Sequence, residues 1–239
     1  MKLRAILPFF LLLLLCLPAG VFSAGSYAVT KKVVEGHTTY HLLDAGRKMD
    51  FGVVPDLGDF GYELKVKGKN LFVSPESLKA YREQRWFCCG MPILWPWVGR
   101  IDRDHYFFQG KKFFFNNALG NLQLDQAKLP THGLLSFDPR WEVVKTGASD
   151  AEGAFITSRV EFYKYPDLMA QFPFAHTIEV TYRLKDGKLE TTTKVSNVGR
   201  APMPFHLGHH PYFRPEGPRE QRWCTERSLI LLSFTRRPT

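Results

Sequence analysis

Two runs of alternating apolar and polar residues flank an Asp-Gly pair and give the strongest structural signal in the sequence. Residues 177–184 read Thr-Ile-Glu-Val-Thr-Tyr-Arg-Leu, and residues 189–195 read Leu-Glu-Thr-Thr-Thr-Lys-Val. A period of two places the apolar side chains on one face of a β-strand. Asp186-Gly187 between the runs is a strong hairpin signal, because Gly and Asp tolerate the positive φ angles of tight hairpin turns. The pattern predicts an antiparallel hairpin with one buried face.

The same unit recurs along the chain. Turn residues separate short runs around Glu35-Gly36, around Gly68-Lys69-Asn70 and around Gln109-Gly110, and residues 141–144 and 155–162 form another candidate pair. Short strands at regular spacing are typical of sandwiches and barrels. We therefore predict an all-β chain that folds as one large two-sheet antiparallel β-sandwich.

Helical signal is thin by comparison. One short helix is expected over residues 74–81, with Ser74 as its N-cap and Pro75 in its first turn. No GxGxxG or P-loop motif indicates a nucleotide site.

The first 24 residues have the features of a secretory signal peptide. Lys2 and Arg4 precede an apolar run over residues 5–17, and residues 21–24 end in small side chains suited to cleavage. The run is too short for a comfortable membrane span. We expect cleavage and export to the periplasm or the exterior, with no stable membrane span afterwards; an uncleaved anchor is the alternative.

One domain is expected over residues 25–221, followed by an atypical tail over residues 222–239. The tail has no turn and no partner strand for its apolar residues 229–234. One interpretation is a final strand with a frayed end. We favour the other, a foreign reading frame after a truncation, and expect a sandwich that is incomplete at the C-terminus.

Charge and cysteine content exclude several function classes. The formal net charge is +9, but the basic residues are scattered, so no nucleic-acid surface is predicted. Cys88 and Cys89 are neighbours that cannot pair without strain, and we expect both to act as small buried hydrophobes. No Cys/His spacing suggests zinc.

Two stretches combine rigid or aromatic residues with groups that can perform chemistry. Residues 90–101 hold two prolines, Trp95 and Trp97, with Arg100 as their one charge. A sugar site needs such an apolar wall beside fixed hydrogen-bond donors. The alternative is a packed loop with Arg100 in a salt bridge. Residues 206–213 hold three histidines, at positions 206, 209 and 210, next to Pro-Tyr-Phe.

Histidine transfers protons near neutral pH, so these residues and His132 are candidate acid–base groups. No metal is expected at His206, His209 and His210, because extended backbone separates their side chains and no acidic ligand is near. The aromatic stretch 169–176 is expected to be core, with His176 structural.

At these residues the sequence resembles the aldose 1-epimerase (galactose mutarotase) family. Four elements match in order: Val53–Gly58, Gly90–Ile101, His132-Gly133 and His210–Phe213. The family has a galactose mutarotase-like fold, a large two-sheet β-sandwich called a β-supersandwich, which agrees with the strand pattern.

The resemblance implies a mechanism and a substrate. The hemiacetal of an aldose opens and recloses on its other face, with no cofactor and no metal. His210 would be the acid at the ring oxygen, and His132 would hydrogen-bond the same region as the second catalytic histidine. Arg100 would bind sugar hydroxyls, and Trp97 and Tyr212 would complete the substrate-binding set.

Two departures from the family pattern bear on activity. Gly99 stands where the family has Asn before the Arg. The family's catalytic base is a Glu well beyond the His-x-Tyr-Phe element, and neither Glu216, Glu220 nor Glu226 sits in a matching motif. We therefore expect impaired activity.

Two alternatives stay open. A hexose-6-phosphate 1-epimerase relative fits the tryptophans and the His-Gly loop, although export argues against a phosphosugar substrate. A non-catalytic carbohydrate-binding module is favoured by the missing base and disfavoured by the two retained histidines.

Overall fold

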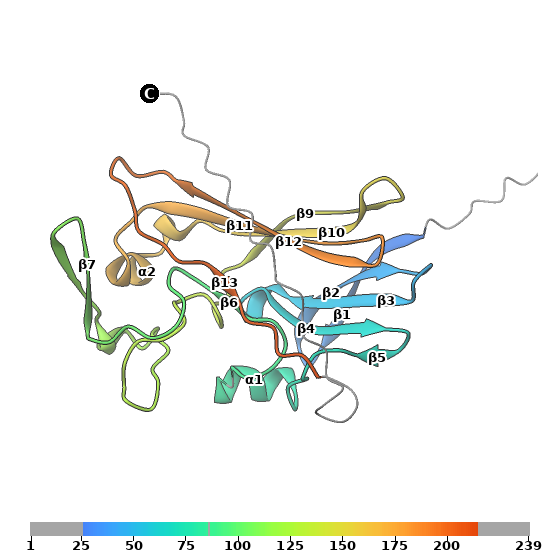
Figure 1. The fold of residues 1–239 in the computed structure, drawn as a ribbon, viewed down its shortest axis with the longest axis horizontal. Coiled ribbons are helices and arrows are strands. Elements are labelled where there is room, and N and C mark those ends of the chain that lie inside the picture. The colour runs from blue at the N-terminus through green and yellow to red at the C-terminus, as the bar shows by residue number, and fades with distance from the viewer. Residues whose placement is uncertain (1–25, 86, 215–239) are drawn as a thin grey trace, which may run out of the picture.

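The computed structural model describes residues 26–85 and 87–214. Within these ranges the chain forms thirteen β-strands and two short α-helices (Figure 1), so the expected all-β character is confirmed. The predicted signal peptide over residues 1–24 and the atypical tail over residues 222–239 lie outside the described residues.

The first sheet has five antiparallel strands in sequential order. They are β1 (Tyr27–Val34), β2 (His37–Asp44), β3 (Met49–Val54), β4 (Phe60–Val66) and β5 (Lys69–Asn70). At the β1–β2 turn, Glu35 and Gly36 both have positive φ, 50° and 84°. Two successive positive φ angles match the right-handed twist of the strands, which is why a Gly stands at the second position.

The second sheet has four antiparallel strands in the order β12-β11-β10-β9. They are β9 (Glu142–Ser149), β10 (Gly153–Val160), β11 (His176–Lys185) and β12 (Lys188–Asn197). The predicted Asp186-Gly187 hairpin is confirmed as the β11–β12 turn. Burial alternates residue by residue along the whole of β11, as the sequence pattern indicated.

The two sheets pack face to face (Figure 1), with β1 and β2 against β9, β10 and β11. Phe51 of β3 contacts Tyr182 of β11, with 5.1 Å between their ring centroids. The Tyr182 hydroxyl also donates a 3.0 Å hydrogen bond to the Asp59 carbonyl. These contacts join the layers, and the antiparallel sandwich is confirmed.

Two small ladders flank the sandwich. β6 (Ile93–Leu94) pairs with β13 (Gly208–His209), and β7 (His105–Phe108) pairs with β8 (Lys111–Phe114). The second ladder is the predicted hairpin around Gln109-Gly110.

The predicted helix over residues 74–81 is displaced. α1 spans Leu78–Gln84 and is capped by Ser77, whose Oγ accepts a 2.9 Å hydrogen bond from the Ala80 N–H. Ser74 lies before the helix, and its hydroxyl accepts a hydrogen bond from the Asn70 side chain. The other helix, α2, spans Pro166–Gln171. Both helices of the described region are too short to cross a membrane.

Candidate active site

The β6–β13 ladder aligns the two segments that carry the sequence motifs. Past the ladder, the His210 N–H donates to the Pro92 carbonyl at 3.0 Å, and the Tyr212 N–H donates to the Gly90 carbonyl at 2.8 Å. Residues 210–212 are thereby held extended. Alternate residues of an extended chain point to the same side. The rings of His210 and Tyr212 accordingly stack, with centroids 4.6 Å apart.

The loop that carries His132 is hydrogen-bonded to residues 95–99 of the first segment. The His132 N–H donates to the Gly99 carbonyl at 2.8 Å, and the Leu134 N–H donates to the Trp95 carbonyl at 2.6 Å. Gly133 between them has a φ of 81°, and a Cβ there would lie 2.0 Å from the Trp95 carbonyl oxygen. Only glycine allows this approach, so the His-Gly pair fixes where His132 lies.

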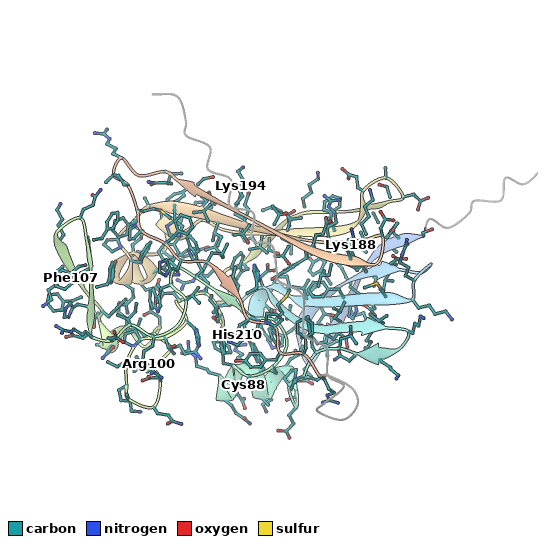
Figure 2. The ribbon with its side chains drawn as sticks, in the orientation of Figure 1. Cys88, Arg100, Phe107, Lys188, Lys194 and His210 are labelled. Atoms are coloured by element: carbon teal, nitrogen blue, oxygen red, sulfur yellow. The ribbon has the colours of Figure 1, made fainter. Side chains whose placement is uncertain are left out.

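The His132 loop and residues 210–212 meet beside Phe87. We call the four rings that gather there the histidine cluster: Phe87, His132, His210 and Tyr212. Phe87 stacks on His132 with ring centroids 4.4 Å apart and planes inclined by 4°, and it makes an edge contact with the ring of His210 at 5.5 Å between centroids. The centroids of His132 and His210 are 5.9 Å apart. In the view of Figure 2, His210 and Cys88 are labelled on the side of the ribbon where α1 lies.

The hydrogen bond to His132 defines the tautomer of its neutral ring. The Gly99 N–H donates to His132 Nδ1 at 3.3 Å, which places the ring proton of the neutral form on Nε2. Partial burial lowers the pKa of His132, and the charges of His210 and Arg100 lower it further. His132 is therefore a neutral hydrogen-bond donor at neutral pH.

Arg100 is joined to the His132 loop through its backbone and to an acid through its side chain. It bridges to Thr131, the neighbour of His132, and its guanidinium forms an ion pair with Asp125. A hydrogen bond from the Leu129 N–H, together with Arg100, lowers the pKa of Asp125. The Arg100 side chain is still 58% exposed, so donors remain for a ligand.

Tyr212 lies next to a cysteine that sequence reasoning misplaced. Cys88 is exposed, not buried as predicted, because the chain bends at residues 88–90 and leaves Cys88 outside while Cys89 and Gly90 are buried. Burial raises the pKa of Tyr212 well above its ordinary value, and a hydrogen bond with Cys88 raises it further. Cys89 is buried as predicted, and burial raises its pKa to about 12.

The structure does not bring Trp97 to the histidine cluster. Trp97 is 6% exposed, packs on Phe115 with ring centroids 5.0 Å apart, and lines an apolar pocket of about 380 Å³. His206 lines the same pocket. Neither histidine of the cluster belongs to its lining, so the predicted role of Trp97 in substrate binding has no geometric support from this pocket.

Of the remaining motif histidines, His176 is fully buried and His209 is partly buried. His176 Nε2 accepts a 2.9 Å hydrogen bond from the Trp95 indole, and its Nδ1–H donates to the Phe174 carbonyl at 2.7 Å. Burial lowers the pKa of both His176 and His209 to about 4. His176 is a structural residue, as predicted, because both of its ring nitrogens have protein partners.

Residues 62–226 match the family model described as aldose 1-epimerase, which is more than half of the chain. The chain belongs to the aldose 1-epimerase family. This agrees with the resemblance found in the motifs.

Solved structures share the fold of this family member. The Slr1438 protein of Synechocystis sp. PCC 6803 is 26% identical with a TM-score of 0.63, over 78% of this chain and 58% of its own length. A galactose mutarotase-like protein from Clostridium acetobutylicum is 22% identical with a TM-score of 0.67, over 79% and 54%. Galactose 1-epimerase from Lactobacillus acidophilus NCFM is 17% identical with a TM-score of 0.59, over 80% and 53%. The chain thus spans somewhat more than half the length of these structures.

Two residues of this candidate site were missed in the sequence. Phe87 precedes the Gly-Met-Pro segment and looks like an ordinary core aromatic, although its ring contacts all three other members of the cluster. Asp125 lies in a loop without a motif. Its place beside Arg100 depends on a bridge between Leu124 and Pro130 that the sequence does not reveal.

Proposed function

We propose that this chain binds an aldose at the histidine cluster and interconverts its α and β anomers. One observation carries the proposal: His132 and His210, from separate motifs, lie with ring centroids 5.9 Å apart beside the exposed guanidinium of Arg100. Aromatic faces for the C–H surface of a sugar lie next to donors for its hydroxyls. This combination suits carbohydrate recognition.

The proposed reaction is acid–base ring opening. His210 gives its proton to the ring oxygen as the C1–O5 bond breaks, while a base takes the proton of the anomeric hydroxyl and the C1=O bond forms. The aldehyde then rotates about C1–C2, and the reverse steps close the ring on the other face. His132 donates a hydrogen bond from Nε2 to the same region and steadies the charge that develops on oxygen.

The described residues of this site offer no good candidate for the general base. Within residues 26–85 and 87–214, neither His132 nor His210 has a hydrogen bond or ion pair with a carboxylate. Asp125 is joined to the site through Arg100, which stabilises its charged form and lowers its basicity. General base catalysis typically contributes about 10²–10⁴-fold to a rate, so we expect turnover below that of a complete acid–base pair by a factor in this range.

The test is anomer exchange followed by polarimetry or one-dimensional NMR. Freshly dissolved α-D-glucose and α-D-galactose are mixed with the protein, and the approach to equilibrium is compared with buffer alone. We expect His210→Gln to abolish the enhancement, whereas the matched control His206→Gln, on the apolar pocket, retains it. Equal enhancement by the His210 variant would overturn the proposal.

A non-catalytic carbohydrate-binding role is the second candidate, favoured by the same lack of a carboxylate at the histidines. It is distinguished by sugar binding in calorimetry without acceleration of anomer exchange. A phosphosugar substrate is disfavoured by the ion pair with Asp125, because this carboxylate already balances the charge of Arg100.

A further inference from the structure

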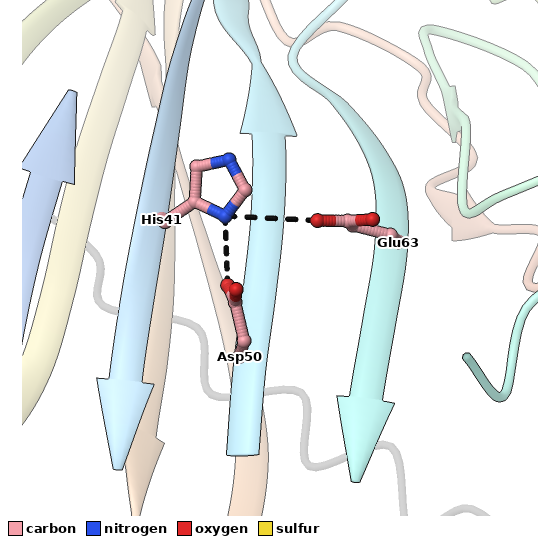
Figure 3. Close-up of side chains that lie close together, drawn as sticks. All are labelled: His41, Asp50 and Glu63. Carbon is pink, nitrogen blue, oxygen red and sulfur yellow. Dashed lines mark hydrogen bonds and ion pairs between the residues drawn. The ribbon is translucent and has the colours of Figure 1, made fainter. Parts of the chain in front are cut away.

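A histidine and two carboxylates meet on the outer face of the five-stranded sheet, far from any residue of the histidine cluster in the sequence (Figure 3). His41 Nδ1 lies 2.8 Å from Asp50 Oδ1 and 3.7 Å from Glu63 Oε1. All three potential ligand atoms lie within 4.8 Å of one another. The residues come from β2, β3 and β4, so adjacent ladders of backbone hydrogen bonds hold them in register.

The sequence makes room for this group with a glycine and a bulge. Gly52 of β3 lies opposite His41 on one side and opposite Glu63 on the other. A Cβ at Gly52 would lie 2.5 Å from the ring of Tyr62. The register shifts beside Gly52, and Tyr62 is the additional residue of β4 at that point, as in a β-bulge. The missing side chain lets the two flanking residues face each other across β3.

Neighbouring side chains contact His41 Nε2 and Glu63 Oε2, whereas His41 Nδ1, Asp50 Oδ1 and Glu63 Oε1 face one another. The Tyr62 hydroxyl lies 3.0 Å from His41 Nε2, and Lys65 Nζ lies 2.6 Å from Glu63 Oε2. When Nε2 carries the proton and donates to Tyr62, Nδ1 presents its lone pair to the carboxylates. The side chain of His41 is 3% exposed and that of Asp50 is 24% exposed, which gives an ion a route of entry beside Asp50.

We propose that His41, Asp50 and Glu63 bind one divalent transition-metal ion of the zinc class. One imidazole and two carboxylates form a mixed nitrogen and oxygen set suited to such ions. Bonds of about 2.1 Å in a tetrahedral site place ligand atoms about 3.4 Å apart. The observed 2.8 and 3.7 Å separations lie on either side of this value, so small side-chain adjustments suffice.

The ion would cross-link three strands on the face opposite the core. Tyr40 and Leu42, the neighbours of His41 on β2, belong to the hydrophobic core between the sheets, so His41 points away from it. The bound ion would therefore stabilise the sheet and take no part in sugar binding or catalysis. The competing explanation is an ion pair between protonated His41 and the two carboxylates, with no affinity for metal.

Zinc titration of the chelator-treated full chain separates these explanations. We expect one Zn²⁺ per chain by calorimetry, and a melting midpoint raised by roughly 5–10 °C at zinc one hundredfold above its Kd. His41→Gln and Asp50→Asn should abolish binding. Tyr62→Phe should weaken it about 10–100-fold, as loss of a partner of a metal-ligating histidine does.

A neighbouring histidine provides the matched control. His37 Nδ1 lies 2.9 Å from Asp56 Oδ2, which is its one carboxylate partner among the described residues, so His37→Gln should leave zinc binding unchanged. Because His41 variants could unfold, Co²⁺ absorption bands of the wild-type chain and of the gentler Glu63→Gln change provide a second readout. No stoichiometric zinc, or equal loss in the His37 and His41 variants, would overturn the proposal and leave the ion pair.

Discussion

His132 and His176 are both histidines whose pKa is lowered by burial, yet their surroundings leave them with different capacities. Both ring nitrogens of His176 are used inside the protein, by the Trp95 indole and the Phe174 carbonyl. Within the part of the chain that the structure describes, His132 uses only Nδ1, for the Gly99 N–H, and is part-buried against Phe87. A histidine with one nitrogen left for a ligand can perform chemistry, whereas a fully bonded one fixes its neighbours.

His209 and His210 repeat the contrast one residue apart. His209 faces the interior, with its ring centroid 6.1 Å from that of Tyr182, and burial lowers its pKa to about 4. His210 points the other way and joins the histidine cluster. Extended backbone sends successive side chains to opposite faces, so adjacent histidines have opposite roles.

The largest loss of stability is expected from a substitution that disrupts the loop holding His132. Gly133→Ala places a Cβ 2.0 Å from the Trp95 carbonyl oxygen at a φ of 81°. We expect a loss of about 3 kcal/mol or more in the free energy of unfolding, measured by urea denaturation. Gly110→Ala is the matched control, with a φ of 73° and nothing within 4 Å, and should cost about 1 kcal/mol. Equal losses would show that the loop does not depend on close contact.

The pH dependence of stability tests whether the protein core holds His176 in its neutral form. Its folded pKa of about 4 lies below the ordinary 6.5, so the unfolded chain binds more protons between these values. The contribution of His176 to the free energy of unfolding is therefore complete above pH 6.5. About 2–3 kcal/mol of it is lost as the pH falls toward 4. His176→Gln should reduce the difference between denaturation free energies at pH 7 and pH 4.5. An unchanged difference would mean that His176 is not held neutral by the core.

The smallest effect concerns Arg100. Arg100→Lys keeps the charge but loses the planar fork of donors, and we expect about tenfold weaker sugar binding, or 1.4 kcal/mol. Stability should change by less than about 1 kcal/mol, because the ion pair with Asp125 is partly exposed. Arg47→Lys is the control and should not alter affinity, because the half-exposed Arg47 pairs with buried Asp44 and exposed Asp186, neither of which belongs to the histidine cluster. Unchanged affinity in the Arg100 variant would remove it from the sugar site.

The hairpins of this fold could be predicted from sequence because their signals are local. Two successive residues with positive φ and a strand on each side require Gly, and the Asp186-Gly187 turn shows this directly. Helix α1 begins a few residues later than predicted, because Ser74 and Ser77 are equally good caps in sequence and the folded chain uses Ser77, whereas Ser74 bonds to Asn70.

The site was predictable only in part for the same reason. His132 and His210 stand in motifs, but Phe87 and Asp125 reach them through packing and loop pairing that depend on the folded chain. Trp97 shows the converse. Its neighbourhood in sequence suggested a sugar wall, whereas folding turned its ring toward Phe115 and the apolar pocket.

The most direct test of the central claim follows the imidazole resonances of isotopically labelled histidines during titration with D-glucose and D-galactose. Single His→Gln variants assign the signals. We expect the resonances of His132 and His210 to shift in a saturable manner, while those of His176 and His209 stay in place. Shifts confined to His176, His209 or His206, with His132 and His210 unmoved, would contradict a sugar site at the histidine cluster.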